Sequence, residues 1–492
     1  MNRFIEKFRS ERSVFFKIGI LILLYFGANV YFAFATDTYA TFSGGFLSSA
    51  IDMTTRNGRP IIGFIYLLHS LSGLSNESFY TISSALALVF LAAAVWLYQR
   101  ILAKYQLGEN TRILLSFVAI ANIFIIEYFM FIEKCGFMLA VLLNIAAVYC
   151  AESFFASKRF PYLIALQAFL ILVILTYPGT IALFVILSIP FALNHSKNLK
   201  AYIQNLFCIG LSYVFSVSVD LLAFKFIFKS SRISYSNDLV SNIETVIRGA
   251  IEYAISTFDI LPRFLFLTLT AFLFAAVVIS AFSHKNKFLY ILNAFVISFA
   301  ALVFSTATIL QGSGWWSTRT TYPIASVAGA FAVQLFLSFP SIPAQCQKAR
   351  LAQRLSLLAI VILLVCQYFS FNKIYIDKYK LNALDAYRCH YIGQAIQDHQ
   401  EVTGETIKRI AFYKDHTPTY SYPDLYAQGD LIVSALTMEW SDLLSINYYL
   451  GTSYEKAVPS DSYIEYFASK DWDQLSQNQF IFDGDTLHLC IY

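Results

Sequence analysis

The chain has 492 residues, of which 58% are hydrophobic, 17% aromatic and only 13% charged, and its mean hydropathy is +0.59. Soluble domains carry about 25% charged residues, so this composition excludes a soluble globular protein and predicts an all-α polytopic membrane protein. The formal net charge of +4 says little, because orientation in a membrane depends on where the charges lie.

The N-terminal segment Met1–Ser13 is basic and precedes the first hydrophobic run, 14–35. That run is too long for the core of a cleavable signal peptide, and no small-residue cleavage site follows it. It therefore predicts a retained first helix with the N-terminus in the cytoplasm. The basic side chains are those of Arg3, Lys7, Arg9 and Arg12.

Hydrophobic runs close to the roughly 17–25 residues needed to cross a bilayer recur along the chain. They predict about 11 transmembrane helices, with the C-terminus outside. Two short runs meet at Tyr177-Pro178-Gly179, which predicts either a tight helical pair or one kinked helix. The predicted ranges are 14–35, 79–98, 112–131, 136–154, 161–176, 179–193, 203–226, 263–282, 287–310, 322–339 and 355–371.

Basic residues gather in every second loop, on the side of the N-terminus, as the positive-inside rule requires. The run 61–74 is too short to span, and counting it would place these loops outside, so it predicts a re-entrant or interfacial helix. The basic residues are Arg100, Lys104, Arg112, Lys158, Arg159, Lys197, Lys200, Lys285, Lys287, Lys348, Arg350 and Arg354.

Two domains are expected. Residues 1–371 form the membrane domain, whose first outer loop, 36–78, holds the candidate catalytic residues. Residues 372–492 are polar and predict a small external α/β domain. Its expected elements are a helix over 381–401, a strand over 409–413, a helix near 438–449 and a strand pair within 479–492. Cys389 and Cys490 both fall in this domain, where a disulfide between them is one hypothesis.

A polar stretch from Asp37 to Pro60 follows the first span and contains two carboxylates and two guanidinium groups. Asp37 is the candidate general base, because a carboxylate at the membrane boundary can take a proton from an attacking hydroxyl. The alternative is a solubilising residue or helix cap at the same position.

Asp52 and Arg56 have the i, i+4 spacing of one helix face, so a plain surface ion pair is the alternative to a catalytic role for Asp52. Arg59 follows an Asn57-Gly58 turn, which presents it at the membrane surface. Guanidinium groups bind phosphate oxygens bidentately, so Arg56 and Arg59 are candidate ligands of a lipid phosphate.

A second candidate segment surrounds Arg319 and contains Trp315, Trp316 and Tyr322. These aromatic residues suit an interfacial anchor whatever the function. The functional interpretation is that Arg319 contacts a second phosphate oxygen while the aromatic rings stack on sugar.

Several other charged residues lie close to predicted spans. Glu127, Glu133 and Lys134 flank a short outer turn and are expected to face the same cavity as Asp37. Asp220 lies inside a span and is expected to pair with Lys225. Cysteine and histidine spacings do not resemble a zinc site, and nothing resembles a nucleic-acid patch.

Taken together, the early outer-loop aspartate, the short apolar helix and the external C-terminal domain resemble the GT-C superfamily of glycosyltransferases. More narrowly, the chain resembles the phage-type serotype-converting (Gtr-like) glucosyltransferases, through Asp37, the run Arg56–Pro60 and the run Arg319–Pro323. The resemblance implies a base role for Asp37, a supporting acid role for Asp52 and phosphate contacts for Arg59 and Arg319. No adjacent acidic pair follows the first span, unlike in many GT-C members, so the choice of base and any divalent metal stay open.

The same resemblance implies a location and partners. The enzyme would sit in the bacterial cytoplasmic (inner) membrane and transfer a hexose from a polyprenyl-phosphate-linked donor to O-antigen or cell-wall polysaccharide, without an organic cofactor and without nucleic acid. The alternatives are a polysaccharide polymerase or ligase, and a non-enzymatic flippase or transporter of lipid-linked glycan.

Overall fold

A computed structural model of the chain describes residues 11–31, 33–228, 239–306, 317–338, 347–414, 431–469 and 475–491. The chain divides into two compact units. The helical unit comprises Met1–Val30, Ala50–Phe129 and Glu133–Asn372, and the sheet-bearing unit comprises Tyr31–Ser49, Met130–Ile132 and Lys373–Tyr492.

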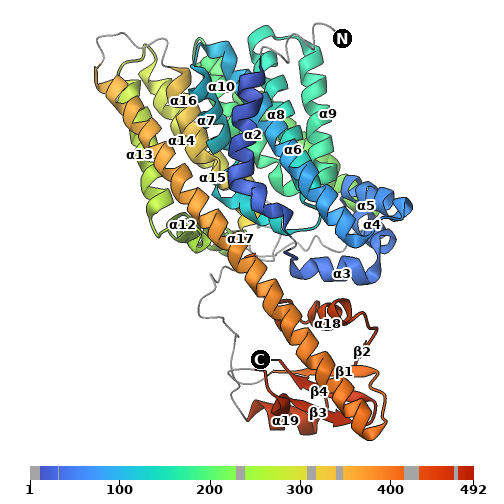
Figure 1. The fold of residues 1–492 in the computed structure, drawn as a ribbon. Helices are drawn as coiled ribbons and strands as arrows, with labels where there is room; N and C mark the ends of the chain where they lie inside the picture. The colour runs from blue at the N-terminus through green and yellow to red at the C-terminus, as the bar shows by residue number, and fades with distance from the viewer. Residues whose placement is uncertain are drawn as a thin grey trace. The chain divides into compact units, whose positions relative to one another are not determined.

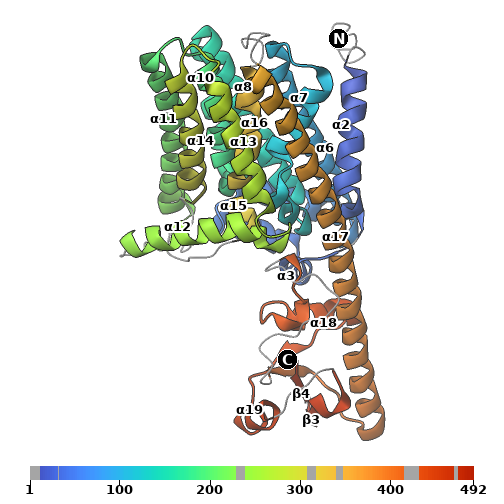
Figure 2. The ribbon, with the colours of Figure 1, turned by 90° about the vertical axis from the view of Figure 1, so that its left-hand side faces the viewer.

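In its described residues the helical unit is built from helices, most of which run side by side (Figures 1 and 2). α12 (Leu239–Ser256) lies across them, at the end of the bundle where α15 begins (Figure 2). The other elements are α2 (Arg12–Phe26), η1 (Gly27–Val30), the part of α4 (Phe46–Thr55) from Ala50 onward, α5 (Pro60–Ser72), α6 (Asn76–Leu102), η2 (Ala103–Tyr105), α7 (Glu109–Ile120), η3 (Ile123–Met130), α8 (Lys134–Ser157), α9 (Phe160–Thr176), η4 (Pro178–Thr180), α10 (Ala182–Asn194), α11 (Leu199–Ala223), η5 (Phe224–Phe228), η6 (Thr257–Asp259), α13 (Leu265–Ala281), α14 (Lys287–Thr306), α15 (Thr318–Ala325), α16 (Val327–Leu337) and the first part of α17 (Gln347–Thr403).

Within the described residues, seven helices are long and apolar enough to cross a membrane, and α7 with η3 makes an eighth if this pair, bent by 62°, is one span. Four apolar helices of 10–17 residues accompany them, including the predicted short helix at Pro60–Ser72. The protein is therefore a helical membrane protein. A helix occurs in each range predicted to span, while the number of spans stays a prediction.

The break at Tyr177 separates two helices. Tyr177 has an extended backbone (φ −157°, ψ 100°) and precedes Pro178, a combination that ends α9 before η4 and α10 begin. Of the two predicted alternatives, the helical pair is therefore the one observed.

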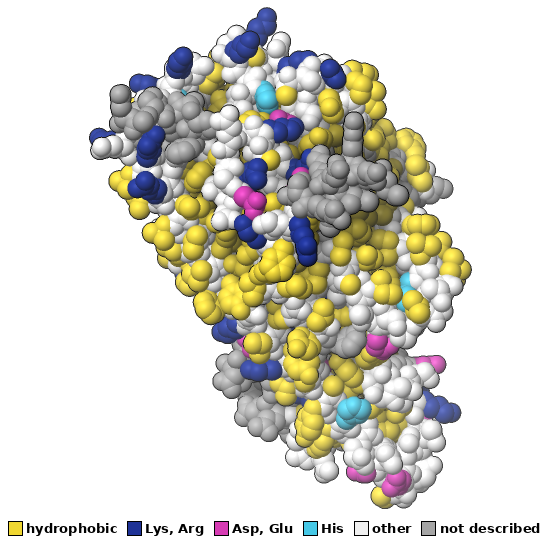
Figure 3. Space-filling model, turned by 45° about the horizontal axis from the view of Figure 1, so that its top comes forward, with side chains coloured by type: hydrophobic (Ala, Val, Ile, Leu, Met, Phe, Trp, Pro, Cys, Tyr) yellow, Lys and Arg dark blue, Asp and Glu magenta, His cyan; other side chains and the backbone are white. Residues whose placement is uncertain are grey.

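The loops predicted to be basic meet at one end of the helical unit, which we call the basic end. Lys17 Nζ lies 2.6 Å from Glu109 Oε1, and buried Glu152 pairs with both Lys104 and His195. A cavity of about 700 Å³ is lined by Lys104 and Lys285 together. Basic side chains gather where α2 begins, and apolar side chains cover the surface beyond (Figure 3). The grouping predicted from the sequence is thus present, although the side of the membrane that it faces stays a prediction.

The sheet-bearing unit contains a four-stranded sheet in the order β2-β1-β4-β3. β1 (Arg409–Tyr413) pairs in parallel with β2 (Glu455–Lys456) and with β4 (Thr486–Cys490), whereas β3 (Phe480–Asp483) pairs antiparallel with β4. The β3–β4 turn contains Gly484 at φ +55°, a conformation that favours glycine. The remaining elements are α3 (Thr36–Gly44), η10 (Ala435–Thr437), α18 (Asp442–Leu450), α19 (Asp461–Ala468), η11 (Gln477–Gln479) and the second part of α17.

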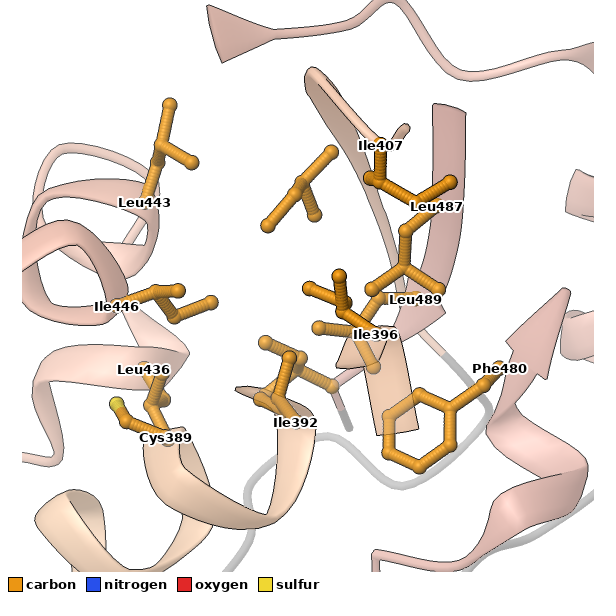
Figure 4. Packing of buried hydrophobic residues seen from close by; sticks show 12 residues of the cluster. Cys389, Ile392, Ile396, Ile407, Leu436, Leu443, Ile446, Phe480, Leu487 and Leu489 are labelled. Atoms are coloured by element: carbon orange, nitrogen blue, oxygen red, sulfur yellow. The ribbon is translucent and has the colours of Figure 1, made fainter. Parts of the chain in front are cut away.

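Both faces of this sheet are covered, because alternate residues of a strand point to opposite faces. Leu487 and Leu489 of β4 pack with Cys389, Ile392 and other apolar residues of α17 and α18 (Figure 4). Cys490 packs on the other face, in the cluster that contains Phe467 of α19. Neither Cys389 nor Cys490 forms a disulfide. The proposed disulfide is therefore wrong, since the sheet separates the two side chains.

Two predicted boundaries differ from the structure. The span 355–371 and the helix 381–401 belong to one helix, α17, of 57 residues. The first span ends earlier than predicted, and Asp37 lies in the first turn of a separate helix, α3, within the sheet-bearing unit. Segment 31–49 therefore packs with residues after 372, where Asn382 exchanges hydrogen bonds with both backbone groups of Phe34.

Candidate functional site

Glu127 organises the site in the helical unit. This carboxylate is 1% exposed and lies on η3. Its Oε2 accepts hydrogen bonds from the Thr318 hydroxyl and, at 2.6 Å, from the Arg319 backbone N–H. Its Oε1 lies 3.5 Å from Arg319 Nε. The carboxylate thus occupies the N-terminus of α15, where unpaired N–H groups and the helix dipole favour negative charge.

Further hydrogen bonds fix α15 against α7 and η3. The Tyr322 hydroxyl donates to the Ile120 carbonyl at 2.7 Å, and the Tyr128 hydroxyl donates to the Arg319 carbonyl at the same distance. Asn122 Nδ2 donates to the Tyr322 carbonyl and to Ser326 Oγ. Tyr322 is fully buried and positions the segment through its hydroxyl, while its predicted role in sugar binding stays a prediction.

Arg59 approaches the same place from the start of α5. The turn before it has Gly58 at φ +63°, and Pro60 occupies the first position of the helix. The Arg59 guanidinium carbon lies 4.6 Å from the centre of the Tyr177 ring. Its Nε is buried without a hydrogen-bond acceptor, and no ion pair of Arg59 occurs among the described residues.

Tyr177 joins the two arginines. Its hydroxyl interacts electrostatically with Arg59, Arg319, Glu127 and Glu133, and its ring packs against Tyr128 and Phe137, with centroids 5.6 and 4.6 Å away. We call Arg59, Glu127, Glu133, Tyr177 and Arg319 the arginine cluster. Arg59 and Arg319, 260 positions apart in the sequence, therefore both lie within electrostatic range of the Tyr177 hydroxyl.

A buried lysine lies beside this cluster. Lys134 is fully buried, donates to Asn29 Oδ1 at 2.9 Å and lies 3.6 Å from the centre of the Tyr80 ring. The neighbouring Glu133 accepts a hydrogen bond from the Tyr66 hydroxyl at 3.2 Å. A lysine without water must be stabilised by such polar and aromatic contacts.

The predicted acids lie on short helices. Asp37 is exposed and belongs to the sheet-bearing unit. Asp52 Oδ1 lies 3.5 Å from Arg56 Nε, and their side chains are 47% and 80% exposed. This is the surface ion pair that the i, i+4 spacing predicts, and it adds at most a few tenths of a kcal/mol.

Other predicted residues have different outcomes. Trp315 and Trp316 lie outside the described residues. No ion pair between Asp220 and Lys225 occurs in the described part of the chain, where Asp220 Oδ1 has no hydrogen-bond partner. The described ranges also contain no group of three or more histidine, cysteine or acidic side chains that could hold a metal ion.

Sequence reasoning missed Tyr177, which we expected only to mark a helix break, and the pairing of Glu127 with Arg319. The pairing had a signal: a carboxylate next to a span requires a partner, and Arg319 is the basic residue before a late span that begins at the same end. For Tyr177 we find no comparable signal. No known family model and no curated protein sequence matches the chain.

Proposed function

We propose that the chain is a membrane-embedded glycosyltransferase that moves a hexose from a polyprenyl-phosphate-linked donor to a cell-surface polysaccharide. The observation that carries this proposal is Arg59, a guanidinium stacked on Tyr177 without an ion-pair partner among the described residues. The Tyr177 hydroxyl also interacts electrostatically with Arg319. Such a cation is available for an anionic ligand, and guanidinium groups match phosphate oxygens geometrically.

The charge balance of the site supports a phosphodiester. Glu127 pairs with Arg319, whose Nε lies 3.5 Å from the Glu127 Oε1, whereas Arg59 has no ion pair among the described residues. Glu127 already accepts hydrogen bonds from the start of α15. One guanidinium without an ion pair suits the single negative charge of a polyprenyl phosphosugar, whose lipid chain would lie along the apolar helices.

In the proposed reaction, the acceptor hydroxyl attacks the anomeric carbon of the donor sugar. Asp37 takes the hydroxyl proton, with Asp52 in support, and general-base catalysis of this kind contributes about 10²–10⁴-fold. The bond between the anomeric carbon and the phosphate oxygen breaks, and the phosphate leaves with the electron pair. Arg59 and Arg319 stabilise that developing charge. The exposed position of Asp37 is accessible to an acceptor that arrives from water.

The proposal places the reaction at the outer face of the bacterial cytoplasmic membrane, with the sheet-bearing unit outside. The experiment that tests it compares surface glycans from cells with and without the gene, by mass and linkage analysis. A difference of one hexose per repeat unit is the expected result. A change only in chain length would indicate a polymerase instead, and identical glycans would contradict any transferase role in that host.

A further inference from the structure

A groove of about 630 Å³ lies between α9 and α11, in a part of the helical unit that the proposed reaction does not use. Its walls are mainly apolar and come from both helices. The most exposed of these side chains have 51–67% of their surface accessible: Phe160, Ile164, Phe207, Leu211 and Phe215. Apolar side chains in a hollow of this size provide a binding surface for a hydrocarbon chain.

Two polar contacts reach α11 near the ends of the groove, one from the turn between α8 and α9 and one from α9 itself. At the basic end, Lys158 Nζ donates to Asn205 Oδ1 at 2.7 Å. Deeper in the bundle, Gln167 Nε2 donates to Ser216 Oγ at 2.5 Å. Along α11 the lining runs from Gln204 to Phe215, a rise of about 16 Å at 1.5 Å per residue, which is close to half of the ~30 Å hydrocarbon thickness. The groove therefore has the length of one leaflet.

The charged side chains at the mouth of the groove are both positive. Lys158 and Arg159 are both exposed, and neither forms an ion pair within the described ranges. The side chains that line the groove include Lys158 and no aspartate or glutamate. A cationic mouth on an apolar groove is complementary to a lipid with an anionic headgroup, and basic pockets between membrane helices bind such headgroups.

We propose that this groove binds one anionic phospholipid of the leaflet at the basic end, with its phosphate on Lys158 and Arg159 and an acyl chain between α9 and α11. The inference does not depend on the proposed transfer reaction. A zwitterionic phospholipid of the same chain length has the same apolar contacts, so the basic side chains account for the selectivity.

Native mass spectrometry of the full chain in detergent tests the proposal, with phosphatidylglycerol and phosphatidylcholine of equal chain length as probes. A Lys or Arg near a lipid surface contributes about 1 kcal/mol, or about fivefold in affinity. Arg159→Gln should therefore weaken phosphatidylglycerol binding about fivefold and the double variant Lys158→Gln/Arg159→Gln about 30-fold. Phosphatidylcholine binding should change less than twofold.

The matched control is Lys197→Gln/Lys200→Gln, which removes two exposed basic residues near the basic end that do not line the groove. This control should leave phosphatidylglycerol binding within twofold of wild type. Cys208→Trp fills the groove and should weaken both lipids. Equal binding of the two lipids by wild type, or an equal loss in the control and in Lys158→Gln/Arg159→Gln, would overturn the proposal.

Discussion

At the scale of single residues, Glu127 has a structural task that can be separated from chemistry. Its carboxylate is buried and accepts hydrogen bonds from Thr318 and Arg319. Glu127→Ala leaves these donors and the charged Arg319 side chain without their acceptor. Removing one partner of a buried ion pair lowers the free energy of unfolding by about 3–5 kcal/mol. We expect a clearly lower midpoint of thermal unfolding in detergent.

The comparison variant is Glu244→Gln, whose carboxylate forms an exposed ion pair with Arg248 at 2.8 Å. Surface pairs of this kind contribute about 0–1 kcal/mol, so the unfolding midpoint should hardly move. Equal midpoints for the Glu127 and Glu244 variants would show that Glu127 does not hold α15 in place.

Asp37 carries the proposed base role, and its replacement tests that role alone. Asp37→Asn keeps the size and exposure of the side chain and removes the proton acceptor, so transfer should fall by about 10²–10⁴-fold while membrane insertion is unchanged. Asp461→Asn is the control, because Asp461 is also an exposed aspartate in the first turn of a helix of the same unit. Wild-type transfer by Asp37→Asn would exclude Asp37 as the base.

At the scale of elements, the contact of α16 with α7 depends on a glycine. A Cβ built on Gly329 would lie 2.3 Å from Ala119 Cα, whereas one on Gly210 meets nothing within 4 Å. Small residues let membrane helices approach closely, and overpacking costs about 1–3 kcal/mol. Gly329→Ala should therefore lower the unfolding midpoint, while Gly210→Ala should leave it unchanged or raise it slightly. Equal effects would mean that α7 and α16 separate at little cost.

The sheet contains a buried histidine that should make its stability depend on pH. His488 on β4 is 6% exposed and shares a 2.7 Å hydrogen bond with the Tyr413 hydroxyl. Burial lowers the pKa of His488 below its usual 6.5, so the folded sheet favours the neutral ring. The stability due to this preference is complete above pH 6.5 and is lost as the pH falls through the lowered pKa.

Hydrogen exchange of the β4 amides in the full chain, corrected for the intrinsic pH dependence of exchange, measures this effect. Protection should decrease as the pH falls from 7.5 to 5.5. His488→Gln removes the titrating ring, so its protection should stay level over the same range. A parallel decrease in wild type and in His488→Gln would assign the pH dependence to other groups.

Secondary structure could largely be predicted, because it depends on local patterns. The apolar runs, the turn before Pro60 and the strand at Arg409–Tyr413 all occur where the sequence predicts them. We predicted two separate helices in place of α17 because the hydropathy falls after Phe371. The helix nevertheless continues, since it contains no proline and a single glycine, Gly393. A helix ends where its backbone hydrogen bonding is interrupted, not where its surface becomes polar.

The candidate site could be predicted only in part. Arg59 and Arg319 were identified from their chemistry and their position beside spans, but their convergence on Tyr177 depends on how distant helices pack. The same holds for Phe34 and Asn382, which place the segment after the first span in the sheet-bearing unit. Such pairings join residues more than a hundred positions apart and leave no local pattern.

At the scale of the whole molecule, the helical unit has two chemically distinct ends. The basic end collects lysine and arginine from alternate loops. The arginine cluster lies away from it, where α5 and α15 begin and α9 ends. This polarity is what an enzyme needs if its lipid-linked substrate is used on one side of a membrane only. The positive-inside rule then predicts that the arginine cluster faces outward.

The central claim is that Arg59 and Arg319 hold the phosphate of a lipid-linked sugar, and the most direct test is the affinity of the full chain for undecaprenyl phosphate in nanodiscs. One charged hydrogen bond contributes about 1.5–3 kcal/mol, so Arg59→Gln should weaken binding roughly tenfold to a hundredfold, and Arg59→Gln/Arg319→Gln should weaken it further. Arg56→Gln, three residues away and paired with Asp52, should bind like wild type. Equal affinities for the Arg59 and Arg56 variants would contradict the account.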